Sequence, residues 1–331
     1  MRLIQYINGQ QQRAVAEVIS AEQIAPLSGV SSTYELAMQA IEAGKSLIEQ
    51  VTALRSDATE SYDTIISEGR LLAPFDHPEQ SHLLVSGTGL THLGSADTRA
   101  NMHAQTSGKT NSELTDTMKM FKMGVEGGKP AAGEVGVQPE WFYKGDGSII
   151  VSPGAELTSP GFALDGGEEP EICAMYVIDK AGQPYRLGFA VGNEFSDHVT
   201  EKVNYLYLAH SKLRPCSFGP ELLVGELPAD IQGHSRIIRD GEIVWEKPFV
   251  SGEDNMSHTI ANLEDHHFKY AQFCRPGDAH VHFFGTATLS FGDGFESKVG
   301  DVFEIGAPDF GRPLQNTLAQ ATSNIPKVKM L

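Results

Sequence analysis

The sequence has no long hydrophobic run, no framework of paired cysteines and no excess of positive charge, and each absence excludes a class of protein. No stretch of about 18 consecutive apolar residues occurs, so a membrane-spanning helix is not expected. The first residues, from Met1 to Ile7, alternate like a strand and lack the apolar core of a signal peptide. We therefore predict a cytoplasmic protein that makes no contact with a membrane.

Cysteines are few, and no serine stands in a nucleophile-elbow pattern. The three cysteines are Cys173, Cys216 and Cys274, which are odd in number and far apart. Such a set is typical of reduced, buried thiols in a cytosolic protein and not of a disulfide framework. A nucleophilic cysteine is a minor alternative, because no base stands beside any of the three in the sequence. Serine hydrolase chemistry is not expected.

Positive charge is also scarce. Lys and Arg number 25 against 43 Asp and Glu, which gives a formal net charge of −18 and a pI near 5.0. A field of that sign repels the phosphates of nucleic acids and of anionic lipids, so neither is an expected partner. A small molecule is expected instead. If that molecule is an acid, a cation or a basic side chain at the site must overcome the field of the protein.

The residues that are present suffice for a substantial core. The chain has 331 residues, of which 40% are hydrophobic and 21% charged, as in ordinary globular proteins. Residues 1–77 have the pattern of a small N-terminal α/β domain, with strands at the start and a helix that opens at residues 31–35 and continues towards Val51. Pro74 and Pro78 then break regular structure. We predict a boundary at residue 77 and a second domain over residues 78–331.

Short strand patterns dominate the chain after Pro139. They are expected at 141–143, 148–151, 171–178, 186–193, 237–245, 281–289 and 302–305. Helices are expected at 97–122 and 256–273, and the glycine-rich stretch 124–136 is expected to be a loop. Many short strands and few helices indicate an α+β protein that is mainly β, with a closed or heavily curled sheet.

A glycine-rich segment follows an apolar strand pattern at residues 83–94. Gly87, Gly89 and Gly94 superficially resemble a dinucleotide-binding fingerprint. The third glycine follows the first by seven residues instead of five, so a dinucleotide site is not expected.

Carboxylates gather at the start of the strand pattern 171–178. Glu169 and Glu171 are two residues apart, so their side chains project to the same side of the strand. Glu168 faces the other way and is expected to be solvated or to lie one layer outside the site. Two like charges on one face repel each other. Solvent, basic neighbours or a divalent cation held by oxygen ligands can offset that repulsion.

More polar residues follow at the ends of later elements. Glu194 ends an apolar strand pattern, Lys212 lies downstream, and the Gly285–Thr286 step ends a late strand. Asp197 and His198 follow Glu194 closely and are candidates for contacts around it.

Two histidines offer an alternative metal site. His280 and His282 form a His-x-His pair on a predicted strand, and this pair could bind a metal with a carboxylate as the third ligand. Because the strand leads directly into Gly285, we interpret both histidines as part of the wall around the acidic residues. The histidines of the predicted helix 256–273 are interpreted as packing or polar-face residues.

The acidic pair, the later acidic residue, the lysine and the Gly-Thr step resemble, in this order, the fumarylacetoacetate hydrolase superfamily. The segments 141–148 and 299–305 add to the likeness, which covers about residues 80–315. The resemblance implies a mixed β-roll catalytic domain that binds Mg²⁺, with Mn²⁺ as an alternative, through Glu169, Glu171 and Glu194. It also implies a homodimer.

Two departures from the superfamily pattern narrow the expected function. The third acidic residue is Glu194 where Asp is usual, which moves the carboxylate by about one carbon–carbon bond. The hydrolases carry a lid in which a His is followed three residues later by a Glu that activates water, whereas His92 is followed by Ser95. The blocks 87–92 and 166–171 instead resemble the branch of 2-keto-3-deoxy sugar-acid dehydratases.

This branch implies Mg²⁺-dependent loss of water from a substrate of the 2-keto-3-deoxyarabonate type, which gives 2-oxoglutarate semialdehyde through an enolate. It assigns enolate stabilisation or proton transfer to Lys212, and acid or base chemistry to His92. To act as a base, Lys212 would need a lowered pKa, which burial and a nearby cation can cause. Substrate contacts are assigned to Ser86, Gly87 and the Gly285–Thr286 step. Hydrolysis of a carbon–carbon bond in an acylpyruvate and non-catalytic binding of a sugar acid are the alternatives.

Overall fold

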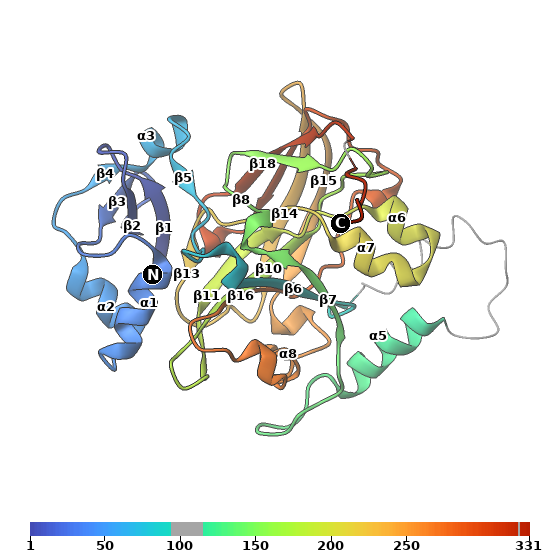
Figure 1. Ribbon diagram of the computed structural model, residues 1–331, viewed down its shortest axis with the longest axis horizontal. Helices are drawn as coiled ribbons and strands as arrows, with labels where there is room; N and C mark the ends of the chain where they lie inside the picture. The colour runs from blue at the N-terminus through green and yellow to red at the C-terminus, as the bar shows by residue number, and fades with distance from the viewer. Residues whose placement is uncertain (94–114, 324) are drawn as a thin grey trace.

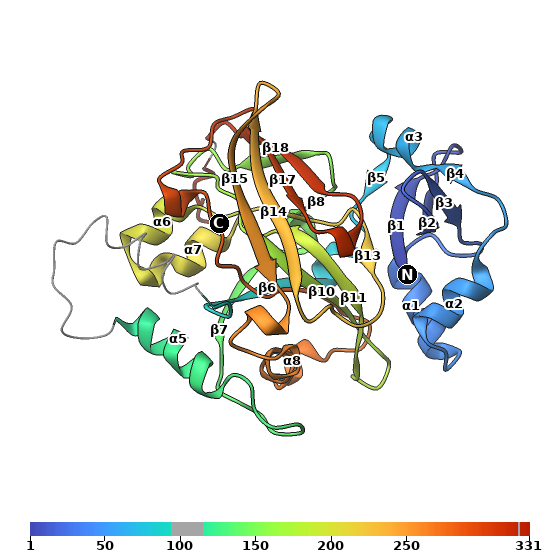
Figure 2. The ribbon, with the colours of Figure 1, turned by 180° about the vertical axis from the view of Figure 1, so that it is seen from behind.

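The computed structural model describes residues 1–93, 115–323 and 325–331. Within them, the body of the protein consists of a larger sheet of 13 strands and a smaller sheet of 5 strands. Figures 1 and 2 show the smaller sheet layered over the middle of the larger one, with helices at the periphery. The α+β, mainly β architecture predicted from the sequence is confirmed.

The strands of the larger sheet are β1 (Arg2–Ile7), β2 (Arg13–Val18), β3 (Gln23–Pro26), β4 (Glu60–Ser61), β5 (Leu71–Leu72), β6 (Leu83–Gly89), β7 (Glu140–Asp146), β8 (Ile150–Val151), β10 (Pro170–Ile178), β11 (Pro184–Asn193), β12 (Cys216–Phe218), β13 (Leu222–Leu223) and β16 (Ala279–Phe283). Those of the smaller sheet are β9 (Glu156–Ser159), β14 (Ile231–Arg239), β15 (Glu242–Ser251), β17 (Val302–Gly306) and β18 (Leu314–Gln320). The helices are α1 (Thr33–Glu42), α2 (Leu47–Leu54), α3 (Tyr62–Ser67), α5 (Asp116–Gly127), α6 (His198–Val203), α7 (Leu208–Lys212) and α8 (Ile260–Phe268).

Strand β10 lies between β11 and β16, and it is buried on both faces. Cys173 and Met175 pack into one hydrophobic core together with residues of β6 and α1. Ile172 and Ala174 pack into a second core with residues of the smaller sheet and α8. Because successive side chains of a strand point to opposite faces, burial of both faces requires the continuous apolar run 172–178. The acidic residues at the start of β10 are therefore attached to a strand that is packed on both sides.

The N-terminal residues are joined to the rest of the protein by both the sheet and the core. Strands β4, β3, β2 and β1 follow one another in the larger sheet, which continues into β13 with Leu3 opposite Leu222. Figure 1 shows this part in blue at one end of the molecule. Leu3 and Phe75 share a hydrophobic core with Val85. Strand pairing and core packing therefore both cross residue 77. The domain boundary at this residue stays a prediction.

The predicted N-terminal helix is two helices. Ser32 caps α1 by accepting a hydrogen bond from the amide three residues on, as the sequence indicated. The helix ends after 10 residues, and Gly44, at φ +62°, lets the chain turn. Ser46 then opens α2 with a capping box. The prediction of one continuous helix towards Val51 is wrong because it overlooked this second set of capping residues.

Two later helices have different ends from those predicted. Helix α5 is capped by Thr115 and runs through Gly127, so it extends into the stretch predicted as a loop. The part of that prediction before residue 115 lies outside the described residues. Helix α8 is capped by Thr259 and ends at Phe268, and a short 3₁₀ turn lies beyond it. The capping side chains of Thr115 and Thr259 set both starting points.

Most predicted strands are present, with shifted ends. Strand β16 ends at Phe283, short of the predicted 289, because Gly285 turns the chain at φ +90°. Strand β18 was not predicted, and β14 begins at Ile231, well before the predicted start. The turn at Asp240–Gly241 was predicted correctly.

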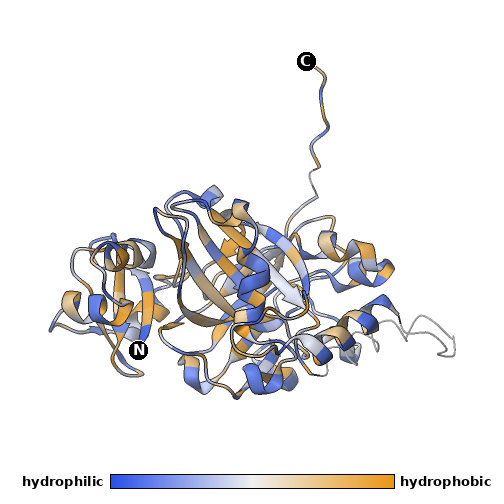
Figure 3. Ribbon diagram, turned by 90° about the horizontal axis from the view of Figure 1, so that it is seen from below, coloured by the Kyte–Doolittle hydropathy of each residue, from blue (hydrophilic) through white to orange (hydrophobic). Residues whose placement is uncertain are grey.

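The helices and the chain end are seen from below in Figure 3, where the helices carry bands of hydrophilic and hydrophobic residues and the C-terminal residues extend away from the body. Among the described residues, no helix is both long enough and apolar enough to cross a membrane.

Candidate active site

Three buried carboxylates meet where β10 begins and β11 ends. The two strands are antiparallel, with Pro170 opposite Asn193, so Glu169 and Glu171 come to lie beside Glu194. Main-chain hydrogen bonds between Glu194 and Glu169 and between Gly167 and Ser196 fix the pairing beyond the strand ends. One carboxylate oxygen from each of the three glutamates lies within 4.8 Å of the others. Their exposed fractions are 7%, 1% and 0%, so solvent does not offset their repulsion.

Two lysines face these carboxylates. Lys212, at the end of α7, makes an ion pair with Glu169 Oε1, and its Nζ lies 2.6 Å from Glu194 Oε2. Lys144, on β7, places its Nζ 2.5 Å from Glu194 Oε1. The Lys144 ammonium also donates to the carbonyl oxygens of Phe195, at 2.7 Å, and of Lys212, at 3.1 Å. Both lysines are buried, and their carboxylate and carbonyl partners hold each side chain in place.

Burial and neighbouring charge pull the three acids apart in pKa. Burial favours the protonated form of Glu169, but the Lys212 ammonium and His198 together hold its pKa below the ordinary value. Burial and the carboxylates of Glu194 and Glu169 raise the pKa of Glu171 well above its ordinary value. Burial also raises the pKa of Glu194, against the opposing effect of the two lysines. The group therefore has more negative charge than its lysines stabilise, which suits a cation with oxygen ligands.

His198 holds Glu169 from the other side. Its Nε2 lies 3.2 Å from Glu169 Oε1 and its Nδ1 lies 3.3 Å from Asp165 Oδ2. Burial would lower the pKa of His198, but the hydrogen bonds and charges of these two acids raise it to about 10. The expectation of a contact beside the site is met for His198. Asp197 makes an ion pair with Arg214 instead, at 2.9 Å.

The Gly285–Thr286 step lies next to the carboxylates. The Gly285 amide donates to Glu171 Oε2 at 2.7 Å. At φ +90° and packed against the Thr91 hydroxyl, position 285 has no room for a Cβ atom. Thr286 Oγ1 accepts a hydrogen bond from the Thr288 amide at 3.1 Å, which shapes the turn. The substrate-binding role of this step stays a prediction.

Glu168 is not solvated, and that part of the prediction is wrong. Its side chain is fully buried and both its oxygens accept hydrogen bonds from Ser290, at 2.8 and 2.7 Å. Burial raises the pKa of Glu168 to about 7, while the hydrogen bonds from Ser290 act in the opposite direction. The alternation of side chains along the strand was read correctly, but the sequence did not show that the other side is also covered.

His92 is a buried residue. Its Nε2 lies 2.9 Å from Ser251 Oγ and its Nδ1 lies 3.1 Å from Thr91 Oγ1, while its backbone bridges to Met256. Burial lowers the pKa of His92 to about 3, so the imidazole is neutral at neutral pH. The acid or base role stays a prediction, and the neutral ring cannot donate as an imidazolium. Ser95, which stands where the hydrolases have the water-activating Glu, lies outside the described residues.

Ser86 and Gly87 point to opposite faces of β6. Gly87 packs under the ring of Phe142, over which Lys212 Nζ lies at 5.0 Å. Ser86 Oγ instead lies 2.8 Å from His282 Nδ1, on the side that faces α8. The neighbour of Ser86 is therefore the histidine cluster, because adjacent residues of a strand alternate in direction, and its substrate-binding role stays a prediction.

The predicted alternative metal site is a hydrogen-bonded histidine cluster. His267 Nε2 lies 3.1 Å from His280 Nδ1, and the rings of His267 and His282 are 4.6 Å apart. The Trp141 indole donates to His267 Nδ1 at 3.2 Å. Among the described residues, the only group of three or more His, Cys, Asp or Glu with close ligand atoms is Glu169, Glu171 and Glu194.

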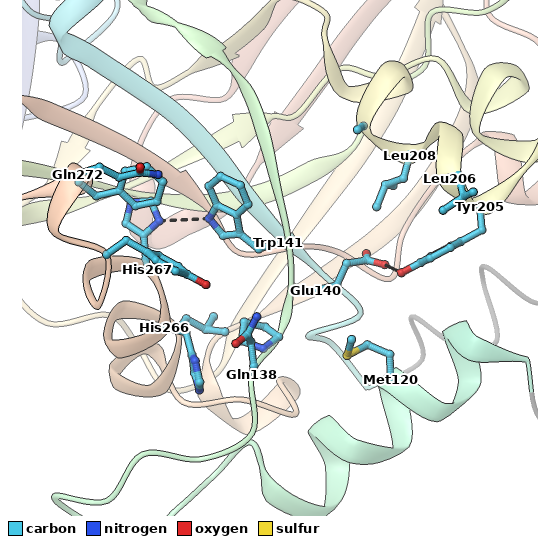
Figure 4. Close-up of a pocket in the computed structure, with 15 residues that line it drawn as sticks. Met120, Gln138, Glu140, Trp141, Tyr205, Leu206, Leu208, His266, His267 and Gln272 are labelled. Carbon is cyan, nitrogen blue, oxygen red and sulfur yellow. Dashed lines mark hydrogen bonds between the residues drawn. The ribbon is translucent and has the colours of Figure 1, made fainter.

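A cavity of about 500 Å³ lies beside the candidate site, between β7, α7 and α8 (Figure 4). Trp141 and His267 line it on one side and Leu208 on the other. Glu140, which is 5% exposed, lies in it with the Tyr205 hydroxyl at 3.3 Å. The cavity shares β7 with Lys144 and α7 with Lys212, so it adjoins the acidic group without being lined by it.

Sequence reasoning missed Lys144 and Asp165. Lys144 stands within the segment 141–148 that carries the resemblance, but no role was predicted for it. The signal was available, because period-two alternation on β7 places Lys144 on the same face as Phe142, and charged residues are seldom buried without a partner. Asp165 gave no such signal, since it lies in an irregular segment whose path depends on tertiary contacts.

Comparison by sequence gives a partial match. No protein-family model matches the chain. Over 114 residues it is 32% identical to a probable 2-keto-3-deoxyxylonate dehydratase of Haloferax volcanii. The match spans 33% of this chain and 38% of the length of that curated relative.

Comparison by structure spans nearly the whole chain. The apo form of a 2-keto-3-deoxy-D-arabinonate dehydratase aligns with a TM-score of 0.69 at 18% identity, over 97% of this chain and 99% of that one. The same enzyme complexed with magnesium and 2,5-dioxopentanoate gives the same TM-score, identity and coverage. A 5-carboxymethyl-2-hydroxymuconate delta-isomerase from Mycobacterium smegmatis aligns with a TM-score of 0.57 at 15% identity, over 97% and 100%. The chain has the fold of these proteins, and both comparisons agree with the resemblance predicted from the sequence.

Proposed function

We propose that the protein is a Mg²⁺-dependent hydro-lyase that removes water from a 2-keto-3-deoxy sugar acid of the 2-keto-3-deoxyarabonate type and forms 2-oxoglutarate semialdehyde. The observation that carries the proposal is the buried group of three carboxylates with the Lys212 ammonium among them. Two kinds of similarity support it, to a probable dehydratase in sequence and to a dehydratase known in complex with magnesium in fold.

The residues present fit a hard divalent cation. Glu169, Glu171 and Glu194 would hold it, and carboxylate oxygens are the ligands that Mg²⁺ prefers. When bound, the cation supplies Lewis-acid stabilisation of negative charge on the oxygens of a 2-oxo acid. His198 orients Glu169 and Lys144 orients Glu194, because each contacts one oxygen of that carboxylate.

The protein's own residues supply the proton chemistry. In the reaction a proton leaves C3 and the hydroxyl leaves C4, which together make one water, and tautomerisation at C5 gives the aldehyde. Burial would lower the pKa of Lys212, but Glu169 and Glu194 raise it above the ordinary value, so the ammonium holds its proton. This favours enolate stabilisation and proton donation over proton abstraction by Lys212. The Gly285–Thr286 step and Gly87 are proposed to contact the substrate.

The proposal is tested by incubating the protein with 2-keto-3-deoxyarabonate and, separately, with an acylpyruvate, and by identifying the products by mass. We expect a product lighter by one water from the sugar acid, no cleavage of the acylpyruvate, and loss of activity in EDTA that Mg²⁺ or Mn²⁺ restores. Cleavage of the acylpyruvate without dehydration would identify a hydrolase. Saturable binding of the sugar acid without turnover would identify a binding protein, and activity that survives EDTA would contradict the role of the metal.

We also propose a homodimer, which the resemblance implies. Light scattering coupled to size-exclusion chromatography measures the mass in solution, and a monomer at all concentrations would contradict this proposal.

A further inference from the structure

Glu168 is the glutamate of the 166–171 segment that the proposed reaction does not use. Its carboxylate is fully buried and is not part of the group formed by Glu169, Glu171 and Glu194. Oε1 accepts from the amide of Ser290 at 2.8 Å, and Oε2 accepts from the hydroxyl of the same residue at 2.7 Å. Ser290 is itself 1% exposed. One carboxylate thus binds one residue through two hydrogen bonds, which fixes both its distance and its orientation.

Ser290 ends the loop that begins at Gly285. The other end of this loop is held by the same segment of chain, since the Gly285 amide donates to Glu171 Oε2 at 2.7 Å. The Phe284 amide donates to the Ile172 carbonyl at 3.1 Å. Glu168 and Glu171, which are three residues apart, thus hold the two ends of one loop.

Two further hydrogen bonds hold the loop between these ends. The Thr288 amide donates to Thr286 Oγ1 at 3.1 Å, and the Thr288 hydroxyl donates to the Pro248 carbonyl at 2.9 Å. A third link lies just past the loop, where the ring of Phe291 stacks on His198 at 5.2 Å. The placement of Thr286 thus depends on contacts at both ends of the loop, and at each end the acceptor is a buried carboxylate.

We propose that Glu168 is a positioning residue for the loop 285–290, and through this loop for the carboxylate of the bound 2-oxo acid. The inference rests on the proposed function, because it takes the Gly285–Thr286 step as the substrate contact. Glu168 touches neither the substrate nor the cation. Loss of its two hydrogen bonds loosens the loop end at Ser290. Glu169 keeps its contacts with Lys212 and His198, Glu194 keeps its contacts with Lys212 and Lys144, and Glu171 keeps the hydrogen bond from the Gly285 amide.

The test separates binding of the cation from binding of the acid. The variants are Glu168→Ala, Glu168→Gln, Ser290→Ala and the double variant Glu168→Ala with Ser290→Ala. Glu221→Ala is the matched control, because Glu221 is also 1% exposed and accepts a main-chain amide, that of Arg312 at 3.0 Å. The readouts are Mn²⁺ affinity by electron paramagnetic resonance, pyruvate affinity of the Mn²⁺-loaded protein by calorimetry, and kcat and KM for 2-keto-3-deoxyarabonate.

For Glu168→Ala we expect pyruvate affinity to fall and KM to rise by about tenfold, with Mn²⁺ affinity and kcat within about threefold of wild type. Glu168→Gln recovers most of the loss, because its amide oxygen accepts from the Ser290 amide and its NH₂ donates to the hydroxyl. Ser290→Ala has a smaller effect of the same kind. The double variant binds pyruvate no more weakly than Glu168→Ala does, since both changes break the same contact.

Unchanged pyruvate affinity in Glu168→Ala, or an equal loss in Glu221→Ala, would overturn the proposal. So would a loss of Mn²⁺ affinity as large as the loss of pyruvate affinity, because Glu168 would then act on the cation site. If Glu168→Ala does not fold, Ser290→Ala and Glu168→Gln decide: unchanged pyruvate affinity in Ser290→Ala overturns the proposal.

The two proposals fail in different ways. A wild-type protein that binds Mn²⁺ and pyruvate but forms no semialdehyde contradicts the proposed function, while the effect of Glu168→Ala on pyruvate binding still decides the positioning role. A wild-type protein that binds pyruvate no better with Mn²⁺ than without it contradicts both.

Discussion

Glu194 carries one methylene more than the aspartate expected at its position, and its surroundings explain how the longer side chain is held. Each of its carboxylate oxygens faces an ammonium, Lys144 at 2.5 Å and Lys212 at 2.6 Å. The Lys144 ammonium also binds the main-chain carbonyl of Lys212. At the scale of residues, the buried Lys144 therefore positions both the Glu194 carboxylate and the main chain at Lys212.

The role of Lys144 can be measured by removing its charge. We expect Lys144→Met to destabilise the protein by about 3–5 kcal/mol, because it leaves Glu194 buried with one partner fewer. Adding Glu194→Gln should recover part of that loss, since the uncompensated charge is then removed. Urea unfolding of the single and double variants measures both values.

Lys180→Met is the control for this prediction. Its Nζ lies 2.5 Å from Glu42 Oε1, the same separation as in the buried pair, but on the surface. We expect an unchanged melting temperature, because exposed ion pairs contribute little. Equal effects of the two lysine variants would mean that burial of Lys144 is not what matters.

Replacing Glu171 by Gln should act differently on the stability of the metal-free protein and on its affinity for a metal ion. Burial and its two acidic neighbours raise its pKa, so Glu171→Gln relieves repulsion and should leave the metal-free melting temperature unchanged or higher. The affinity for Mn²⁺ should fall by more than the roughly 10–100-fold typical of residues outside the ligand shell. Activity should be lost while the fold survives. A variant that binds Mn²⁺ as wild type does would remove Glu171 from the proposed ligands.

At the scale of elements, β16 and α8 bury a histidine cluster that lies apart from the carboxylates. Burial lowers the pKa of His280 to about 4 and that of His282 to about 3, and burial also lowers the pKa of His267. Nε2 of His280 and of His282 has no hydrogen-bond partner among the described residues. Neutral rings packed together are stable only while they stay unprotonated, so these elements make the protein sensitive to acid.

This sensitivity has a definite sign. The unfolded chain takes up a proton at His280 below its ordinary pKa of 6.5, whereas the folded protein does so only near 4. Stability supplied by the neutral ring is therefore present at higher pH and is lost as the pH falls from about 6.5 towards 4. Between about pH 7.5 and pH 5.5 this amounts to about 1.4 kcal/mol for one histidine.

His280→Leu removes that contribution. The unfolding free energy of the variant should fall less between about pH 7.5 and pH 5.5 than that of wild type, by about 1.4 kcal/mol. The charged groups that shift the pKa of His280 are Asp278 and Arg275, and both are retained in the variant. His210→Leu, at an exposed position, should leave the pH dependence as it is. Parallel curves for His280→Leu and wild type would contradict the prediction.

At the scale of the whole molecule, the N-terminal part and the rest share one sheet and one core. Strand β1 pairs with β13, and Leu3, Val15 and Phe75 pack with Val85 and Cys173. A sequence boundary marked by two prolines is therefore not a structural gap. Removal of the first part would uncover the edge of β13 and the core beneath it.

Expression of residues 78–331 alone tests this coupling. We expect the fragment to be insoluble, or to melt well below the full chain, because it exposes apolar residues that the N-terminal part covers. Co-expression with residues 1–77 should restore solubility if the two pieces associate. A soluble fragment with the melting temperature of the full chain would establish two independent domains and support the boundary predicted from the sequence.

Local sequence determined much of this protein. The alternation of Glu169 and Glu171, the apolar run after them, the cap at Ser32 and the turn at Asp240 were all legible, because each depends on neighbours within a few residues. The ordered motifs predicted the resemblance and the mainly β fold. The alternation of the strand also predicted that the side chain of Glu168 faces away from those of Glu169 and Glu171.

Only the tertiary structure decided what each side chain meets. It placed Lys144 against Glu194, turned Ser86 towards His282 and buried Glu168 on Ser290, although local pattern alone gave no partner for any of them. The physical reason is that a strand's period fixes the face to which a residue points, while the layer covering that face comes from distant chain.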